Sequence, residues 1–87
     1  MIIETASDWA INNGFHEIDT DTSDEFVAWM ECDFDPETEH GTPYTGVKAW
    51  RDEVRGCFVA IRRYETGEQM GDQRGFGDTM LQALQDL

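Results

Sequence analysis

The sequence predicts an α+β fold: one small domain spanning residues 1–87, with an antiparallel sheet of three or four strands and N- and C-terminal helices packed on one face. Apolar residues recur at helical spacing near both ends of the chain, and segments rich in β-branched and aromatic residues lie between them. A chain of this length buries only roughly 60 to 65% of its unfolded surface, which allows a single core. Since an isolated hairpin is marginally stable, the helices need a sheet of at least three strands to pack on.

The first helix is predicted over residues 5–12, "TASDWAIN", with either Thr5 or Ser7 as its N-cap. The following "NNG" is a typical helix stop, and the expected buried side is formed by Ala6, Trp9 and Ala10. Residues 15–18 are expected to form a short extended segment. A polar turn, "DTDTSD", should then occupy residues 19–24.

Residues 25–35, "EFVAWMECDFD", fit two structures. As a helix, the segment would begin with a capping box formed by Thr22 and Glu25. As a strand, it would place five apolar residues on a single face: Phe26, Ala28, Met30, Cys32 and Phe34. This consistent alternation, together with the β-branched and aromatic content, favours the strand.

In the second half of the chain, the positions of proline and glycine and the residue types between them predict the elements. Pro36 and the loop after it should end the preceding strand, and a short helical turn is expected over residues 47–54, "VKAWRDEV". Residues 57–64, "CFVAIRRY", are the clearest strand, followed by a hairpin turn and a short strand ending at residues 74–77, "RGFG". The last helix should begin at Asp78 or Thr79, with an apolar side made of Met80, Leu81, Leu84 and Leu87.

The charge is large and uneven. The chain holds 19 acidic and 6 basic residues, for a net charge of −13; residues 1–40 contain 12 of the acids and no Lys or Arg, which leaves −12 there and −1 in the remainder. Such a chain is not expected to bind DNA, RNA or an anionic membrane directly, because those polyanions are held by Lys and Arg. With neither a membrane-length apolar run nor a signal peptide, we expect a cytoplasmic protein. Cys32 and Cys57 form no CxxC pair and are expected to be reduced core residues.

Metal sites and catalysis are not predicted. Asp19, Asp21 and Ser23 match the first positions of a calcium loop, but Asp24 replaces its glycine and Met30 its final glutamate. Zinc ligands would have to come from residues without any recognised pair spacing, His16, Cys32, His40 and Cys57. The usual hydrolase and phosphate-binding motifs are missing, so no cofactor and no enzymatic activity are expected. We interpret the glycines of "GDQRGFGD", Gly71, Gly75 and Gly77, as turn residues.

The stretch "ECDFDPETEH" sets a carboxylate at every second position, at Glu31, Asp33, Asp35, Glu37 and Glu39. In an extended chain such residues recur about every 6.6 to 6.8 Å along one side, close to the spacing of phosphates along a nucleic-acid strand. The row could therefore enter a basic groove in place of a nucleic acid, although a solvated acidic face would look the same. The predicted partner-binding residues are these five, Asp19 and Asp21, and two aromatic anchors, Trp29 and Tyr44.

The tail, with Gly75, Gly77, Thr79, Ala83 and Leu84 to Leu87, resembles the end of many small phage proteins. In size, acidity and lack of catalytic motifs, the chain is similar to counter-defence proteins of phages and mobile elements, the anti-CRISPR proteins and DNA-mimic inhibitors. This resemblance implies an inhibitor, acting in the host cytoplasm, that binds the basic nucleic-acid groove of a host nucleic-acid-processing or CRISPR-Cas-like defence protein. The alternative is a phage accessory or assembly domain that binds a protein partner or itself, for example as a homodimer, with its acidity serving solubility only.

Overall fold

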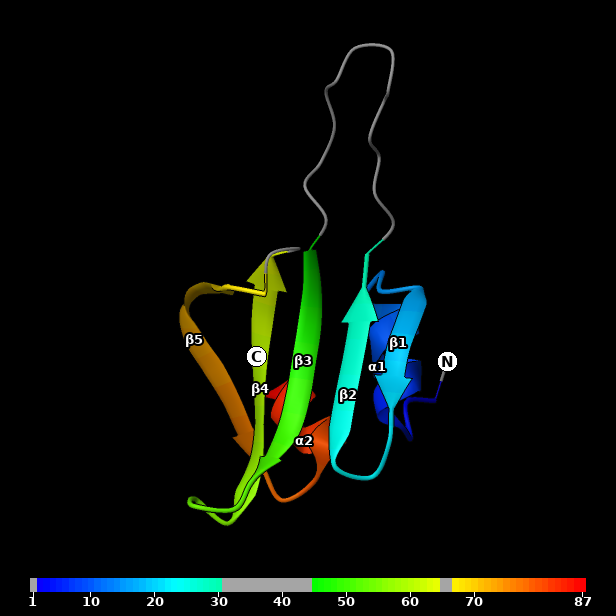
Figure 1. Cartoon of the computed structure of the whole chain (residues 1–87). Helices are drawn as coiled ribbons and strands as arrows, with labels where there is room; N and C mark the ends of the chain where they lie inside the picture. The colour runs from blue at the N-terminus through cyan, green and yellow to red at the C-terminus, as the bar shows by residue number, and fades with distance from the viewer. Residues whose placement is uncertain (1, 31–44, 65–66) are drawn as a thin grey trace, which may run out of the picture.

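The computed structural model describes residues 2–30, 45–64 and 67–87 (Figure 1). The order of elements is α1 (Ala6–Asn12), β1 (Glu17–Asp21), β2 (Glu25–Trp29), β3 (Thr45–Asp52), β4 (Cys57–Tyr64), β5 (Gln69–Gly77) and α2 (Met80–Gln85). The strands form one antiparallel sheet in the order β1-β2-β3-β4-β5. A small α+β domain with an antiparallel sheet and two short helices is thus confirmed. The predicted number of strands is wrong, because the sheet has five.

The start of α1 agrees with the prediction for residues 5–12. Thr5 is the N-cap: its hydroxyl accepts a hydrogen bond from the Asp8 amide at 3.1 Å, and the Asp8 carboxylate accepts one from the Thr5 amide at 3.2 Å. A helix of seven residues is too short to be stable alone. It is held by burial of Trp9 and Ala10, and the Trp9 ring stacks on Phe15 with 5.9 Å between ring centroids.

The β1–β2 hairpin corrects the predicted turn over residues 19–24. β1 continues to Asp21, and the turn is closed by the Thr22 amide, which donates to the Glu25 carbonyl at 2.9 Å. The Thr22 hydroxyl also accepts from the Glu25 amide at 3.1 Å, so the pair that could have capped a helix shapes a hairpin instead. The strand interpretation is confirmed for β2. The rest of the predicted segment 25–35 beyond Met30 lies outside the described residues.

β3 replaces the predicted helical turn over residues 47–54. Val47 and Ala49 point into the core, while Lys48 and Trp50 point to the other side, which is the period of a strand. β3 lies between β2 and β4; it pairs with β4 along its whole length and with β2 over residues 46–50, and this non-local pairing overrides the weak local pattern. Val54, expected on the helical side, is 97% exposed in the turn after β3.

β4 matches the predicted strand over residues 57–64, and β5 is longer than expected. Gly75 and Gly77 are not turn residues but lie inside β5, where α2 packs directly against the strand backbone. A Cβ atom on Gly75 would overlap the Ala83 carbonyl, and one on Gly77 would lie 2.5 Å from the Gln82 Cβ. These two glycines therefore set the distance between α2 and the sheet.

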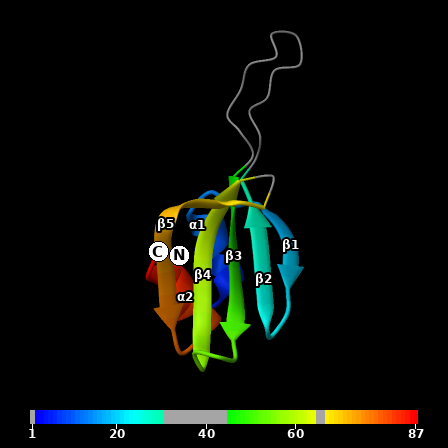
Figure 2. The same ribbon diagram turned by 60° about the vertical axis from the view of Figure 1, so that its left-hand side comes forward.

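Both helices lie on the same side of the sheet, as the two views show (Figures 1 and 2). The side of the sheet that faces them is called the inner face. One core joins it to the helices, and its buried members are Trp9, Ala10, Phe15, Phe26, Ala28, Val47, Ala49, Ala60, Ala83 and Leu84. Three of the sheet residues are alanines, which lets the short helices approach the sheet closely. Within the described ranges, no helix is long and apolar enough to span a membrane.

Candidate functional site

The opposite side of the sheet, called the outer face, is covered by neither helix (Figure 2). The strand register arranges its residues in rows across the sheet. One row runs Trp29–Gly46–Arg63, a second Val27–Lys48–Ile61–Arg74, and a third Glu25–Trp50–Val59–Phe76. The outer face therefore combines large apolar side chains with basic ones.

A small second apolar cluster lies on the outer face. Val27 is 3% exposed and Val59 is fully buried, although neither belongs to the core under the helices. The register gives these valines large neighbouring side chains on the same face, among them Lys48 beside Val27. The register places Trp50 and Phe76 on either side of Val59, and Phe76 itself is 40% exposed.

Three cations lie against the aromatic rings of this face. The Arg63 guanidinium carbon is 4.6 Å from the Trp29 ring centroid, the Lys48 Nζ is 5.6 Å from that of Trp50, and the Arg55 guanidinium carbon is 5.1 Å from that of Phe76. Each such pair is worth about 0.5 to 1 kcal/mol at an exposed site.

The Trp29 ring also lies against the backbone of Gly46. A Cβ atom on Gly46 would be 2.5 Å from a ring carbon, so only glycine leaves room for this position of the indole. Sequence reasoning placed Trp29 as an anchor among carboxylates. The structure puts Trp29 on the outer face between the Gly46 backbone and Arg63, with the carboxylate residue Glu17 as its register partner on β1. Its role as a partner-binding anchor stays a prediction.

The outer face is nearly neutral within a very acidic chain. Four of the six basic residues belong to it or to its rim: Lys48, Arg55, Arg63 and Arg74. The register assigns three carboxylates to the same face, Glu17, Glu25 and Asp52. Counted by register alone, the outer face holds three cations, Lys48, Arg63 and Arg74, and three carboxylates, so its net charge is about 0 (three minus three) and the remaining residues carry the whole −13.

The predicted partner-binding residues Asp19 and Asp21 lie on β1, at an edge of the sheet, and both are exposed. They do not continue a straight row of carboxylates. Ile18 pairs with Ala28 and Thr20 with Val27, so Asp19 is the extra residue of a β-bulge. The bulge reverses the alternation, and the carboxylates of β1 therefore spread over different directions.

The other predicted partner-binding residues lie outside the described residues; they are Glu31, Asp33, Asp35, Glu37, Glu39 and Tyr44. Among the described residues, the ion pairs within 4.0 Å are Lys48–Glu25 at 3.8 Å and Arg55–Asp52 at 3.3 Å. Asp19, Asp21 and the exposed turn residue Asp24 take part in neither.

Sequence reasoning missed the outer face as a unit. Lys48, Trp50, Ile61 and Arg74 come from three strands, and the helical assignment of residues 47–54 concealed the alternation of β3. Cys57 also belongs to this side, in register with Asp52, and is half-buried. Its predicted place in the core is therefore wrong. The available signal was limited to β3, where Val47, Lys48 and Ala49 alternate between apolar and polar residues.

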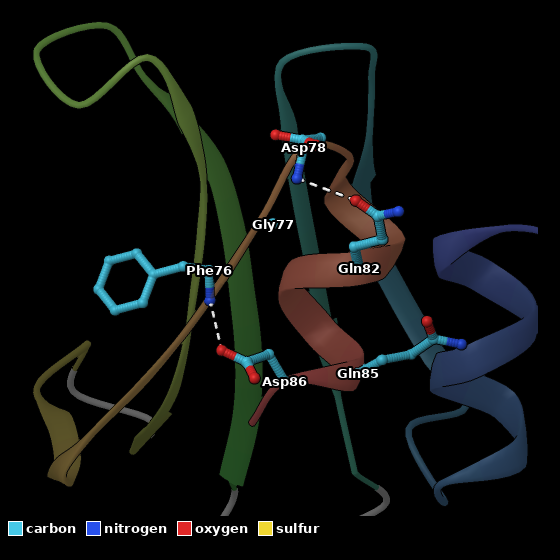
Figure 3. Close-up of a pocket in the computed structure, with 6 residues that line it drawn as sticks. All are labelled: Phe76, Gly77, Asp78, Gln82, Gln85 and Asp86. Carbon is cyan, nitrogen blue, oxygen red and sulfur yellow. Dashed lines mark hydrogen bonds between the residues drawn. The ribbon is translucent and has the colours of Figure 1, made fainter.

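A depression of about 400 Å³ lies between the free edge of β5 and α2 (Figure 3). The Asp86 carboxylate accepts from the Phe76 amide at 3.0 Å, and the Gln82 side-chain oxygen accepts from the Asp78 amide at 2.9 Å. The lining includes no histidine, cysteine, hydroxyl or basic side chain; it consists of Phe76, Gly77, Asp78, Gln82, Gln85 and Asp86. The Asp86 carboxylate thus occupies the Phe76 amide on β5, an edge strand, and that amide is not available to another strand.

The described part of the chain contains no group of three or more His, Cys, Asp or Glu side chains arranged to hold a metal ion. Comparisons with protein-family models, with curated proteins and with solved structures found no match to this chain. Two surfaces of the described residues are candidates for function: the acidic edge at β1 and the outer face.

Proposed function

We propose that the protein is a non-catalytic inhibitor whose acidic surface binds the basic nucleic-acid groove of a host nucleic-acid-processing or defence protein, of the CRISPR-Cas type. The observation that supports this proposal is the exposure of Asp19, Asp21 and Asp24 at the β1 edge and its turn, outside the ion pairs found among the described residues. Carboxylates outside the ion pairs of the described residues remain available to Lys and Arg side chains of a partner.

The proposed inhibition has two steps: the acidic chain is attracted to the basic groove, and the bound chain then excludes nucleic acid from it. Single exposed ion pairs contribute only about 0 to 1 kcal/mol, so the affinity depends on several contacts made together. The net charge of −13 also raises the association rate of the chain with a basic surface at low ionic strength. A bound inhibitor that pairs with the groove's cations leaves fewer of them to neutralise phosphates, and nucleic acid is excluded.

Two triple variants with equal charge test the proposal. The test variant is Asp19→Lys, Asp21→Lys and Asp24→Lys; the control reverses three exposed acids elsewhere, Glu53→Lys, Glu68→Lys and Asp72→Lys. Each changes the net charge from −13 to −7, by three steps of +2.

Tagged protein is used to capture basic proteins from nuclease-treated host lysate, and the captured protein is then challenged with DNA. We expect the wild type and the control to retain a partner that DNA displaces, and the β1 variant to lose it. Equal capture by all three proteins contradicts a role for the β1 edge. Equal loss in both variants shows that bulk charge, rather than this surface, drives binding.

A second candidate function is that of an accessory domain which assembles through an apolar surface. The specific observation in its favour is the outer face, where Trp29, Trp50 and Phe76 lie on a side of the sheet that no described helix covers.

A further inference from the structure

We propose that two copies of the chain pair through the outer face, sheet against sheet, around a two-fold axis. This inference concerns a different surface from the acidic edge and does not rest on the proposed inhibitory function. The starting point is the composition of the outer face, where Trp50, Ile61 and Phe76 come together from three adjacent strands. Aromatic residues and arginine are enriched in protein interfaces, whereas most exposed sheet faces are polar.

Charge favours a second copy as the occupant of this face. The residues that the register assigns to the outer face have a net charge of about 0, whereas the remainder of the chain carries −13. Two copies that approach through the outer face therefore meet less like-charge repulsion than through the strongly acidic remainder. A polyanion would extend beyond the few cations on this face toward the acids of β1.

The presence of both positively and negatively charged residues on the outer face also suits a two-fold contact. In such an interface residue i of one copy meets residue j of the other, and j meets i in return. A face with both cations and carboxylates can satisfy this condition, because Lys48 or Arg74 of one copy can meet Glu25 of the other. Glu25 lies at the side of the face toward β1, and Arg74 lies on β5 at the opposite side.

The size of the face is adequate for a stable dimer. Five strands about 4.8 Å apart, five to nine residues long at about 3.3 Å per residue, give a flat area of roughly 550 Å². Projecting side chains increase the accessible area above this value, toward the roughly 800 Å² per partner of a standard interface. Two sheets packed at about 10 Å would cover the side chains that a single chain leaves partly exposed on this face, Trp50, Ile61 and Phe76. The helices and the β1 edges would remain accessible.

Sedimentation equilibrium measures the assembly directly. The protein is examined from about 1 μM to about 1 mM, a range that covers Kd values in the micromolar region, and at about 0.15 M and about 1 M NaCl. We expect a concentration-dependent rise to twice the 10.0 kDa mass of one chain. The dimer should persist at high salt, because apolar contacts are not screened. A mass of one chain at every concentration overturns the proposal, and so does a dimer that dissociates at about 1 M NaCl, which would indicate a contact between the acidic edge and the cations.

A matched pair of substitutions locates the interface. Ile61→Lys puts a charge in the middle of the outer face, and Ile11→Lys makes the same change on α1, where Ile11 is 41% exposed. We expect Ile61→Lys to raise the dimer Kd by at least a factor of about ten, equivalent to about 1.4 kcal/mol, and Ile11→Lys to leave it unchanged. Equal Kd values for both variants overturn the proposal. Circular dichroism checks the fold, and if Ile61→Lys does not fold, Phe76→Lys at the 40% exposed Phe76 tests the same face.

The two proposals fail independently of one another. An Ile61→Lys monomer that still captures a basic partner separates dimerisation from inhibition. A triple β1 variant that still dimerises but captures nothing separates them in the opposite direction.

Discussion

Gly75 offers the sharpest test of how α2 packs on the sheet. In a strand, replacing glycine by alanine normally stabilises the protein by up to about 1 kcal/mol, and valine is favoured further. The structure predicts the opposite sign at Gly75, because a Cβ atom there would overlap the Ala83 carbonyl. α2 would have to move away from β5, and the fully buried Leu84 would lose part of its cover.

The expected size of the effect follows from that overlap. Inserting a methyl group into a filled site costs about 1 to 3 kcal/mol, and for a domain of this size each kcal/mol lowers Tm by about 4 to 8 °C. A chain of 87 residues has a total stability of roughly 4 to 13 kcal/mol. We therefore expect Gly75→Ala to fold with a clearly lower Tm, and Gly75→Val to be less stable again.

Urea denaturation with fluorescence detection gives the free energy of unfolding for both Gly75 variants. Hydrogen exchange locates the damage, which should be greatest at the amides of Ala83 and Leu84 in α2. Gly71→Asn serves as a control, because a Cβ at Gly71 meets nothing within 4 Å and asparagine tolerates its φ of +71°. If Gly75→Ala or Gly75→Val is as stable as the wild type, the close contact between α2 and β5 is refuted.

Three further predictions concern other parts of the fold. Thr5→Ala should lower the free energy of unfolding by about 1 kcal/mol by removing the α1 cap, while Ser7→Ala, at the rejected cap position, should leave it unchanged in the same urea titration. Gly46→Ala should displace the Trp29 ring, destabilise the protein by about 1 to 3 kcal/mol, and shift the tryptophan emission spectrum. Raising NaCl from about 0.05 M to about 0.5 M should increase Tm by screening the self-repulsion of a chain with charge −13; a constant or falling Tm would show that attractive pairs dominate.

The elements that sequence reasoning predicted well are those with strong local signals. β4 is rich in β-branched and aromatic residues, and α2 follows a threonine cap whose hydroxyl accepts from the Gln82 amide at 3.1 Å. β3 lacked such a signal, since Val47, Trp50 and Val54 recur near helical spacing while the adjacent residues alternate. Its structure is decided by pairing with β2 and β4. These two strands are distant from each other in sequence, so a pattern read over a short stretch of residues does not include both.

The two candidate surfaces also differ in how far they can be predicted from the sequence. The acidity of residues such as Asp19 and Asp21 can be counted directly, but the bulge that turns their carboxylates in different directions depends on the register with β2. The outer face needs even more information, because Trp50, Ile61 and Arg74 become neighbours only when three strands are aligned. A one-residue change of register would transfer each of them to the inner face.

Because the acidic edge and the outer face are separate surfaces, salt should affect partner binding, dimerisation and folding stability in three different ways. Screening should weaken the attraction between the carboxylates near Asp21 and a basic groove, because that attraction acts through exposed charges. It should leave the contact around Ile61 intact or strengthen it, since two acidic chains repel one another less while their apolar contact is unaffected. It should also stabilise the single folded chain. A binding loss between about 0.15 M and about 0.5 M NaCl, with an unchanged dimer mass and a rising Tm, would therefore assign binding to the acidic edge and dimerisation to the outer face.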